Sequence, residues 1–195
     1  MDNILVLPEK IITTDSSEEL IELAKSGRSD AFDRLVNIYS AQIYNYILRM
    51  VNNVHDAEDL TQITFIKAWD GLKDFKKDHS FLPWLFVIAR RTVLNHLRSH
   101  KHQVSQITQD QIEHIAETQV TNLYQSEQID HVWNCARSLP KKYFEVLWLK
   151  YAEGFSTSEI SKITGIGNIH VRVLLYRARC LLIKKLKKFQ AYETL

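Results

Sequence analysis

The sequence predicts an all-α protein made of two small helical domains joined by a flexible acidic linker. Apolar residues recur at helical spacing through most of the 195 residues. Five Gly and three Pro leave little material for the many tight turns of a β protein. Four Trp, eight Tyr and eight Phe supply enough bulk for a core, whereas the formal charge of +2 favours no class of partner by itself.

The first domain is expected at residues 15–100, after an N-terminal extension at 1–14. A helix beginning near Ser29 carries a regular apolar series, namely Phe32, Leu35, Val36, Tyr39, Ile43 and Ile47. The next helix is expected to open at Asp56, because acids in the first turn suit the helix dipole. Residues 70–83 are rich in charge and predict a loop, with Pro83 at the start of another helix.

Residues 101–128 are expected to form the linker. No Lys or Arg occurs from His102 to Ala136, while the same stretch holds the acids Asp110, Glu113, Glu117, Glu127 and Asp130. A structureless stretch of this length inside one compact domain would be unusual, which favours a connection between two domains. A plain solvated spacer explains the composition equally well.

The second domain is expected at residues 129–195 and has the layout of a helix-turn-helix. Ser156 and Glu159 form the pattern of a capping box, and Gly165 with Gly167 interrupts the chain soon afterwards. A last helix then runs to about Phe189. Its core face is predicted to contain Val171, Leu175, Ala178 and Leu182. Two helices joined by a short Gly-containing turn are typical of DNA-binding domains.

Two basic surfaces are predicted, one in each domain. No acid occurs from Ile160 to Tyr192, a stretch with Lys162, Arg172, Arg177, Arg179, Lys184, Lys185, Lys187 and Lys188. None occurs from His79 to Gln109, a stretch with Arg90, Arg91, Arg98 and Lys101. Because neutralisation of phosphates supplies most of the affinity for nucleic acids, this distribution indicates a nucleic-acid-binding protein.

The sequence contains little that supports catalysis, cofactor binding or metal binding. His96 and His100 are spaced as a zinc-binding pair, but no further ligand follows at useful spacing, which favours a solvated face. No nucleophile elbow, P-loop or HExxH motif occurs, so we expect no enzyme. Cys135 and Cys180 do not make a disulfide framework. With no secretory signal and no membrane-length apolar run, the expected location is the cytoplasm.

Four segments resemble the sigma-70 family of RNA polymerase sigma factors. The segments "SGRSDAFDRLVNIYSAQIYNYILRMV", "DAEDLTQITFIKAWDGLKDF" and "SFLPWLFVIARRTVLNHLR" are similar, in order, to regions 2.1, 2.2 and 2.3–2.4. The segment "LPKKYFEVLWLKYAEGFSTSEISKITGIGNIHVRVLLYRARCLL" is similar to region 4. The short linker, with no region 3 domain, resembles the extracytoplasmic-function (ECF) group. The resemblance covers about residues 18–100 and 130–187.

This resemblance implies an alternative sigma factor that binds bacterial core RNA polymerase, directs promoter recognition and transcription initiation, and is controlled by an anti-sigma factor. The polymerase would be bound through Asp56, Glu58, Asp59, Gln62 and Phe65. The −10 element would be opened by capture of a flipped base. The residues implied there are Phe75, Lys76, Lys77, Asp78, His79, Ser80, Arg90, Arg91 and Arg98. The −35 element would be bound by Ser156, Lys162, His170, Arg172, Val173, Arg177 and Arg179.

The last helix departs from the family pattern. Where members have a run like Thr-Val-Lys-Ser-Arg, this chain has His-Val-Arg-Val-Leu at residues 170–174. Arg172 keeps the cation, whereas Val173 and Leu174 replace polar groups. Val173 could contact a thymine methyl group, and Leu174 could pack on a neighbour or on an inhibitory partner.

Two other classes of protein stay open at this point. A stand-alone helix-turn-helix regulator would bind duplex DNA tightly without polymerase. A helical adaptor that binds no DNA is disfavoured by the two acid-free basic stretches. Salt-independent behaviour toward DNA would support it.

Overall fold

A computed structural model of the chain describes residues 14–76, 80–104 and 127–193, and this part contains helices and loops but no strand. The N-terminal half consists of α1 (Thr14–Lys25), α2 (Ser29–Val51), α3 (Val54–Gly71), the 3₁₀ turn η1 (Leu72–Asp74) and α4 (Phe81–Val104). The C-terminal half consists of α5 (Glu127–Arg137), α6 (Lys141–Leu147), the π-helical turn η2 (Trp148–Ala152), α7 (Thr157–Thr164) and α8 (Asn168–Glu193). The all-α fold class is confirmed. The linker and extension predicted at 101–128 and 1–14 lie largely outside the described residues.

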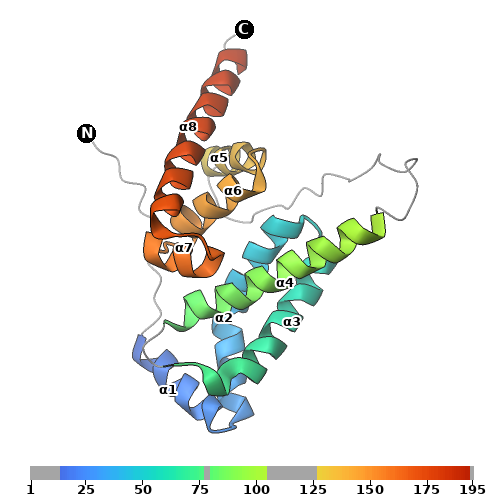
Figure 1. Ribbon diagram of the computed structural model, residues 1–195, viewed down its shortest axis with the longest axis vertical. Helices are drawn as coiled ribbons and strands as arrows, with labels where there is room; N and C mark the ends of the chain where they lie inside the picture. Colours follow the sequence, from blue (N-terminus) through green and yellow to red (C-terminus); the bar gives the residue numbers. More distant parts are fainter. Residues whose placement is uncertain (1–13, 77–79, 105–126, 194–195) are drawn as a thin grey trace.

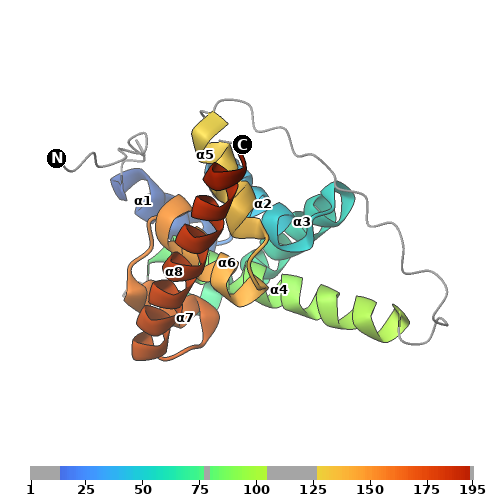
Figure 2. The same cartoon turned by 90° about the horizontal axis from the view of Figure 1, so that it is seen from above.

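The two halves differ in shape (Figure 1). In the N-terminal half, α2, α3 and α4 pack against one another and α1 packs on α2. In the C-terminal half, α6 and α7 pack against the first part of α8, whose remaining turns project away from the body of the molecule. Figure 2 shows α5 beside α8, in agreement with the contacts of α5 with α6 and α8.

Local side chains set the helix ends of the N-terminal half. Asn52 ends α2 in the left-handed conformation, with a φ of 56°. The side-chain oxygen of Asn53 then accepts a hydrogen bond from the backbone N–H of Asp56, at 3.1 Å. Helix α3 therefore begins at Val54, two residues before the predicted start, because Asn53 rather than an acid caps it. Asp56 stays in the first turn, as expected.

The turn between α7 and α8 follows the sequence prediction. The backbone N–H of Glu159 donates to Ser156 Oγ at 3.2 Å, and the N–H of Ser156 donates to Glu159 Oε2 at 2.8 Å. This is the expected capping box, which satisfies two otherwise unpaired donors of the helix start. Gly165 ends α7 with a φ of 71°, a backbone conformation that residues other than Gly, Asn or Asp rarely adopt.

Replacing Ser156 with Ala is expected to lower the free energy of unfolding by about 1 kcal/mol, because the first turn of α7 loses its cap. Ser158→Ala in the same helix is the control, since Ser158 is exposed and lies inside α7, where Ala is the better helix former. Urea denaturation followed by circular dichroism measures both values. Equal stability of the two variants would contradict a role of the cap.

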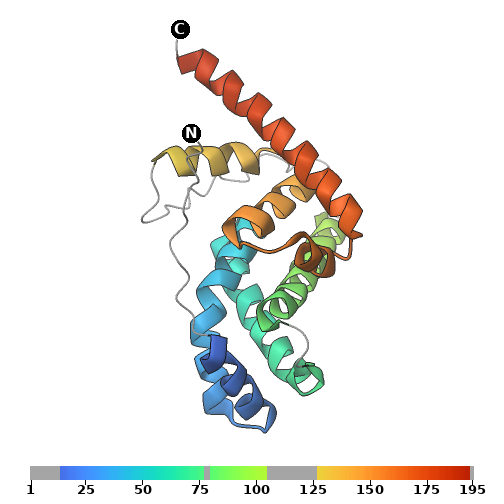
Figure 3. The ribbon, with the colours of Figure 1, turned by 90° about the vertical axis from the view of Figure 1, so that its left-hand side faces the viewer.

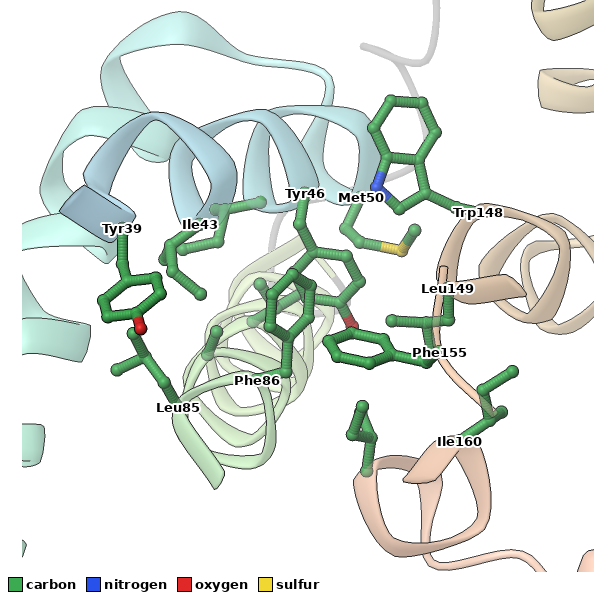
Figure 4. Packing of buried hydrophobic residues seen from close by; sticks show 14 of the residues in the cluster. Tyr39, Ile43, Tyr46, Met50, Leu85, Phe86, Trp148, Leu149, Phe155 and Ile160 are labelled. Atoms are coloured by element: carbon green, nitrogen blue, oxygen red, sulfur yellow. The ribbon is translucent and has the colours of Figure 1, made fainter. Parts of the chain in front are cut away.

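The two halves share one hydrophobic core. The ring of Phe86 on α4 lies 5.0 Å from the ring of Tyr46 on α2 and 4.9 Å from that of Phe155, which precedes α7. Figure 4 shows these rings together with Leu149 and Ile160 of the C-terminal half. In Figure 3, α7 lies against α4, and these two helices are in contact. The halves are therefore packed against each other, not held apart.

Candidate nucleic-acid interface

The side chains predicted to bind the −35 element lie at the start of α7, on α7 and on α8. Those of the turn and of α7 and α8 are all exposed, namely Ser156, Lys162, His170, Arg172, Val173, Arg177 and Arg179. Helix α8 has no acid before its last residue, Glu193, so the exposed cations of its earlier turns have no carboxylate near them on the same helix. Ser156 differs from the others because its hydroxyl already serves the capping box.

Val173 and Leu174 point in different directions. The exposed fraction is 39% for Val173 and 8% for Leu174. Leu174 belongs to the core with Val171 and Ala178, which lie one turn before and one turn after it. Leu174 thus packs inside its own domain, and of the two only Val173 is available to a base. Leu182, the last predicted core residue, is only partly buried.

Two exposed apolar side chains of α8 were not predicted as part of the site. Ile169 is 80% exposed and Tyr176 is 63% exposed. With Val173 between them, they follow the 4-3 spacing of one helix face, so this signal was present in the sequence. The face that carries the arginines therefore has an apolar stripe beside it.

The loop before α4 requires a correction. Phe75 was predicted to contact DNA, but it is buried, with its ring 5.0 Å from that of Trp84 and 5.6 Å from that of Phe81. Lys25 Nζ donates a hydrogen bond to the carbonyl of Phe75 at 2.8 Å. Phe75 is thus a core residue that fixes the loop. Lys76 and Ser80 are exposed beside it, and the predicted residues Lys77, Asp78 and His79 lie outside the described part.

The arginines predicted on α4 have different surroundings. Arg91 and Arg98 are exposed. Arg90 is instead bound to a carboxylate of the C-terminal half, because its Nε donates to Glu145 Oε1 at 2.7 Å and its Nη2 to Glu145 Oε2 at 3.4 Å. In this conformation the Arg90 guanidinium is already bound to Glu145.

The predicted polymerase-binding residues on α3 also differ in their exposure to solvent. Glu58, Asp59 and Gln62 are exposed. Asp56 is half-buried, with its Oδ2 3.4 Å from His96 Nε2. Phe65 is a second correction, because it is buried in the core and its ring lies 6.5 Å from that of Phe32.

Two further side chains extend the exposed face of α3. Ile63 is 39% exposed and Ile66 is 62% exposed. Both continue the face of Asp59 and Gln62 at 3-4 spacing. The exposed face of α3 therefore combines carboxylates with apolar side chains.

A polar network crosses between the halves, and no local pattern in the sequence indicates it. Glu145 of α6 accepts hydrogen bonds from Arg90 and, at 3.0 Å, from Tyr46 Oη. Glu153, just after η2, accepts one from Gln42 Nε2 and one, at 2.9 Å, from Trp148 Nε1. Glu145 and Glu153 thus each accept a hydrogen bond from a donor of the N-terminal half.

Burial keeps the Tyr46 hydroxyl protonated. Loss of hydration raises the pKa of Tyr46 well above its ordinary value, and the neighbouring Glu145 carboxylate raises it further. Its O–H therefore remains a donor at neutral pH. Arg49, one turn along α2, lies with its guanidinium carbon 5.3 Å from the centre of the Trp148 ring, a cation–π distance.

Comparison with known proteins decides the family. The models for sigma-70 region 2 and sigma-70 region 4 match residues 35–103 and 130–182. The chain is 32% identical over 182 residues to the ECF RNA polymerase sigma factor SigW of Bacillus subtilis, covering 86% of this chain and 95% of that protein. The chain belongs to the ECF sigma factors. It is also 33% identical over 149 residues to SigM of the same organism, covering 75% and 90% of the two chains.

Family membership makes the chain an alternative sigma factor of RNA polymerase and disfavours the stand-alone regulator. The fold of this sigma factor is similar to solved structures. CnrH, in complex with the cytosolic domain of CnrY, has a TM-score of 0.65 at 22% identity, covering 89% of this chain and 99% of that chain. RpoE of Bartonella quintana, in complex with the anti-sigma factor NepR, has a TM-score of 0.66 at 23% identity, covering 80% and 96%.

The described residues of the sigma factor contain no group of three or more His, Cys, Asp or Glu side chains that could hold a metal ion. His96, one of the two histidines with zinc-like spacing, lies against Asp56, and the side chain of His100 is outside the described part. No helix among the residues described is long and apolar enough to cross a membrane.

Proposed function

We propose that this sigma factor binds core RNA polymerase through the exposed face of α3, the opened −10 strand through α4 and the loop before it, and the −35 duplex through α8. The observation that carries this proposal is the separation of charge. Exposed carboxylates gather on α3, at Glu58 and Asp59, while α8 carries exposed arginines with no acid before Glu193. Basic surfaces suit phosphates, and an acidic surface suits a protein partner with basic groups.

The division of labour follows the expected domains. Residues 15–100 would act as region 2, residues 101–128 as the linker and residues 129–195 as region 4. Helix α4 ends at Val104 and helix α5 begins at Glu127, which supports a linker between two helical units, although both helices extend a few residues into the range 101–128.

At the −35 element, α8 would lie in the major groove with its exposed cations near the phosphates. Arg172, Arg177 and Arg179 are the groups available for this contact. Val173 would meet the base edges, and its branched methyl groups favour a thymine methyl. His170 at the N-terminal end of the helix can donate to a base or a phosphate.

We further infer control by an anti-sigma factor. RpoE of Bartonella quintana is in complex with the anti-sigma factor NepR, and this relative in fold supports a similar partner here. The sigma factor would have no catalytic activity of its own and would act in the cytoplasm, where it meets the polymerase.

Charge reversal at Asp59 tests the polymerase interface. Asp59→Lys is expected to weaken the binding of core polymerase by roughly tenfold or more, because an exposed carboxylate on the binding face would become a cation. The measurement is a titration of labelled core polymerase with the purified protein, without DNA.

Asp33→Lys on α2 is the matched control, because Asp33 is exposed and lies on a different helix. It should bind as the unchanged protein does. If both variants bind polymerase alike, α3 does not form the interface.

A further inference from the structure

The contacts between the halves are arranged on two helix faces. Gln42, Tyr46 and Arg49 lie at positions i, i+4 and i+7 of α2, which places them on one face. On α4, Phe86 and Arg90 lie four residues apart. All five contact residues of the C-terminal half, through Glu145, Trp148, Glu153 and Phe155.

Glu145 of the C-terminal half forms an ion pair with Arg90 of the N-terminal half. The side chains of Arg90 and Glu145 are 19% and 13% exposed, so bulk water and salt screen the pair less than a surface ion pair. The hydroxyl of Tyr46, which is fully buried, donates to the same carboxylate oxygen as Arg90 Nε. A carboxylate with two such donors forms stronger hydrogen bonds than neutral groups do.

We propose that Glu145 is an intramolecular latch, which holds the two halves closed by binding Arg90 and Tyr46. While the latch is closed, the Arg90 guanidinium is bound to a carboxylate of the same chain and cannot bind a phosphate of DNA. Glu145 thus occupies the place of a phosphate at Arg90. The part of this inference that concerns DNA rests on the proposed function of Arg90 at the −10 element.

Promoter geometry requires the latch to open. The −10 and −35 elements are about 25 base pairs apart, which is roughly 85 Å of B-DNA at 3.4 Å per base pair. Helices α4 and α8 have 24 and 26 residues, so even placed end to end they would reach only about 75 Å. Halves that share one core therefore cannot bind both elements at once.

The latch is tested on the full chain by small-angle X-ray scattering. Glu145→Gln keeps the shape of the side chain and removes its charge, and it is expected to shift the ratio of open to closed molecules by roughly tenfold or more. The radius of gyration should rise, with the helix content from circular dichroism unchanged. Tyr46→Phe, which removes only the second donor, should shift the ratio in the same direction.

Glu19→Gln is the matched control, because Glu19 is exposed on α1 and loses the same charge. Its scattering should equal that of the unchanged protein. Arg90→Gln should open the molecule, and adding Glu145→Gln to it should have little further effect, because the two changes remove one interaction. If neither Glu145→Gln nor Tyr46→Phe raises the radius of gyration, the latch is overturned.

A second measurement separates the latch from the proposed function. The probe is a fluorescent 20-nucleotide single strand of dT, titrated at low salt with each protein in the absence of polymerase. Glu145→Gln should bind the strand several-fold more tightly than Glu19→Gln, and the gain should vanish in the Arg90→Gln background. If scattering shows opening while DNA binding stays unchanged, the latch is supported and the −10 role of Arg90 is overturned.

Discussion

Replacing Phe86 with Ala is expected to lower the free energy of unfolding by about 3–5 kcal/mol. Phe86 is fully buried between the rings of Tyr46 and Phe155, so truncation leaves a cavity where the N-terminal half meets the C-terminal half. Neither neighbour can fill that space without losing its own contacts. Urea denaturation followed by far-UV circular dichroism gives the value.

Tyr176→Ala is the control for this change, since it also removes a ring, but from a side chain that is 63% exposed on α8. Its effect should stay within about 0.5 kcal/mol. A loss below about 1 kcal/mol for Phe86→Ala would mean that the core does not extend across the halves in solution.

The second large effect is expected at Leu174, where the family pattern has Arg. Leu174→Arg should lower the free energy of unfolding by about 3 kcal/mol, because it places an unpaired cation at a buried position of α8. Restoring the family residue at this position would thus damage the fold instead of improving DNA binding. Thermal and urea denaturation both measure the loss.

Val173→Arg provides the comparison, because the adjacent position is 39% exposed and a long cationic side chain can reach solvent there. It should change stability by less than about 0.5 kcal/mol. Similar losses at both positions would show that α8 is rotated about its axis relative to the described structure.

Local patterns in the sequence predicted the helix-turn-helix well. The capping box of Ser156 with Glu159 and the left-handed end at Gly165 both depend on residues within four positions of each other. The burial of Leu174 was also within reach, because an apolar stripe wider than 100° includes it beside Val171 and Leu175. The narrower stripe of Val171, Leu175, Ala178 and Leu182 does not include it.

Contacts between distant residues could not be predicted in the same way. Phe75 lies among charged residues and Phe65 follows exposed residues of α3, and the burial of each depends on a ring from another element, Trp84 and Phe32 respectively. Glu145 and Arg90 are 55 residues apart, and nothing near either residue indicates the pair. The predicted interfaces therefore stay predictions, and the sequence did not indicate the burial of Phe65 and Phe75 or the binding of Arg90 by Glu145.

The shared core has a consequence for how this sigma factor competes for polymerase. If only the open form binds, the apparent dissociation constant equals the intrinsic value divided by the fraction of open molecules. When the closed form predominates, a stronger contact between Phe86 and Phe155 that raises the ratio of closed to open molecules tenfold weakens the apparent affinity for polymerase tenfold. Neither ring need touch the polymerase. Substitutions in the core of the free protein would thus set its rank among the sigma factors of a cell.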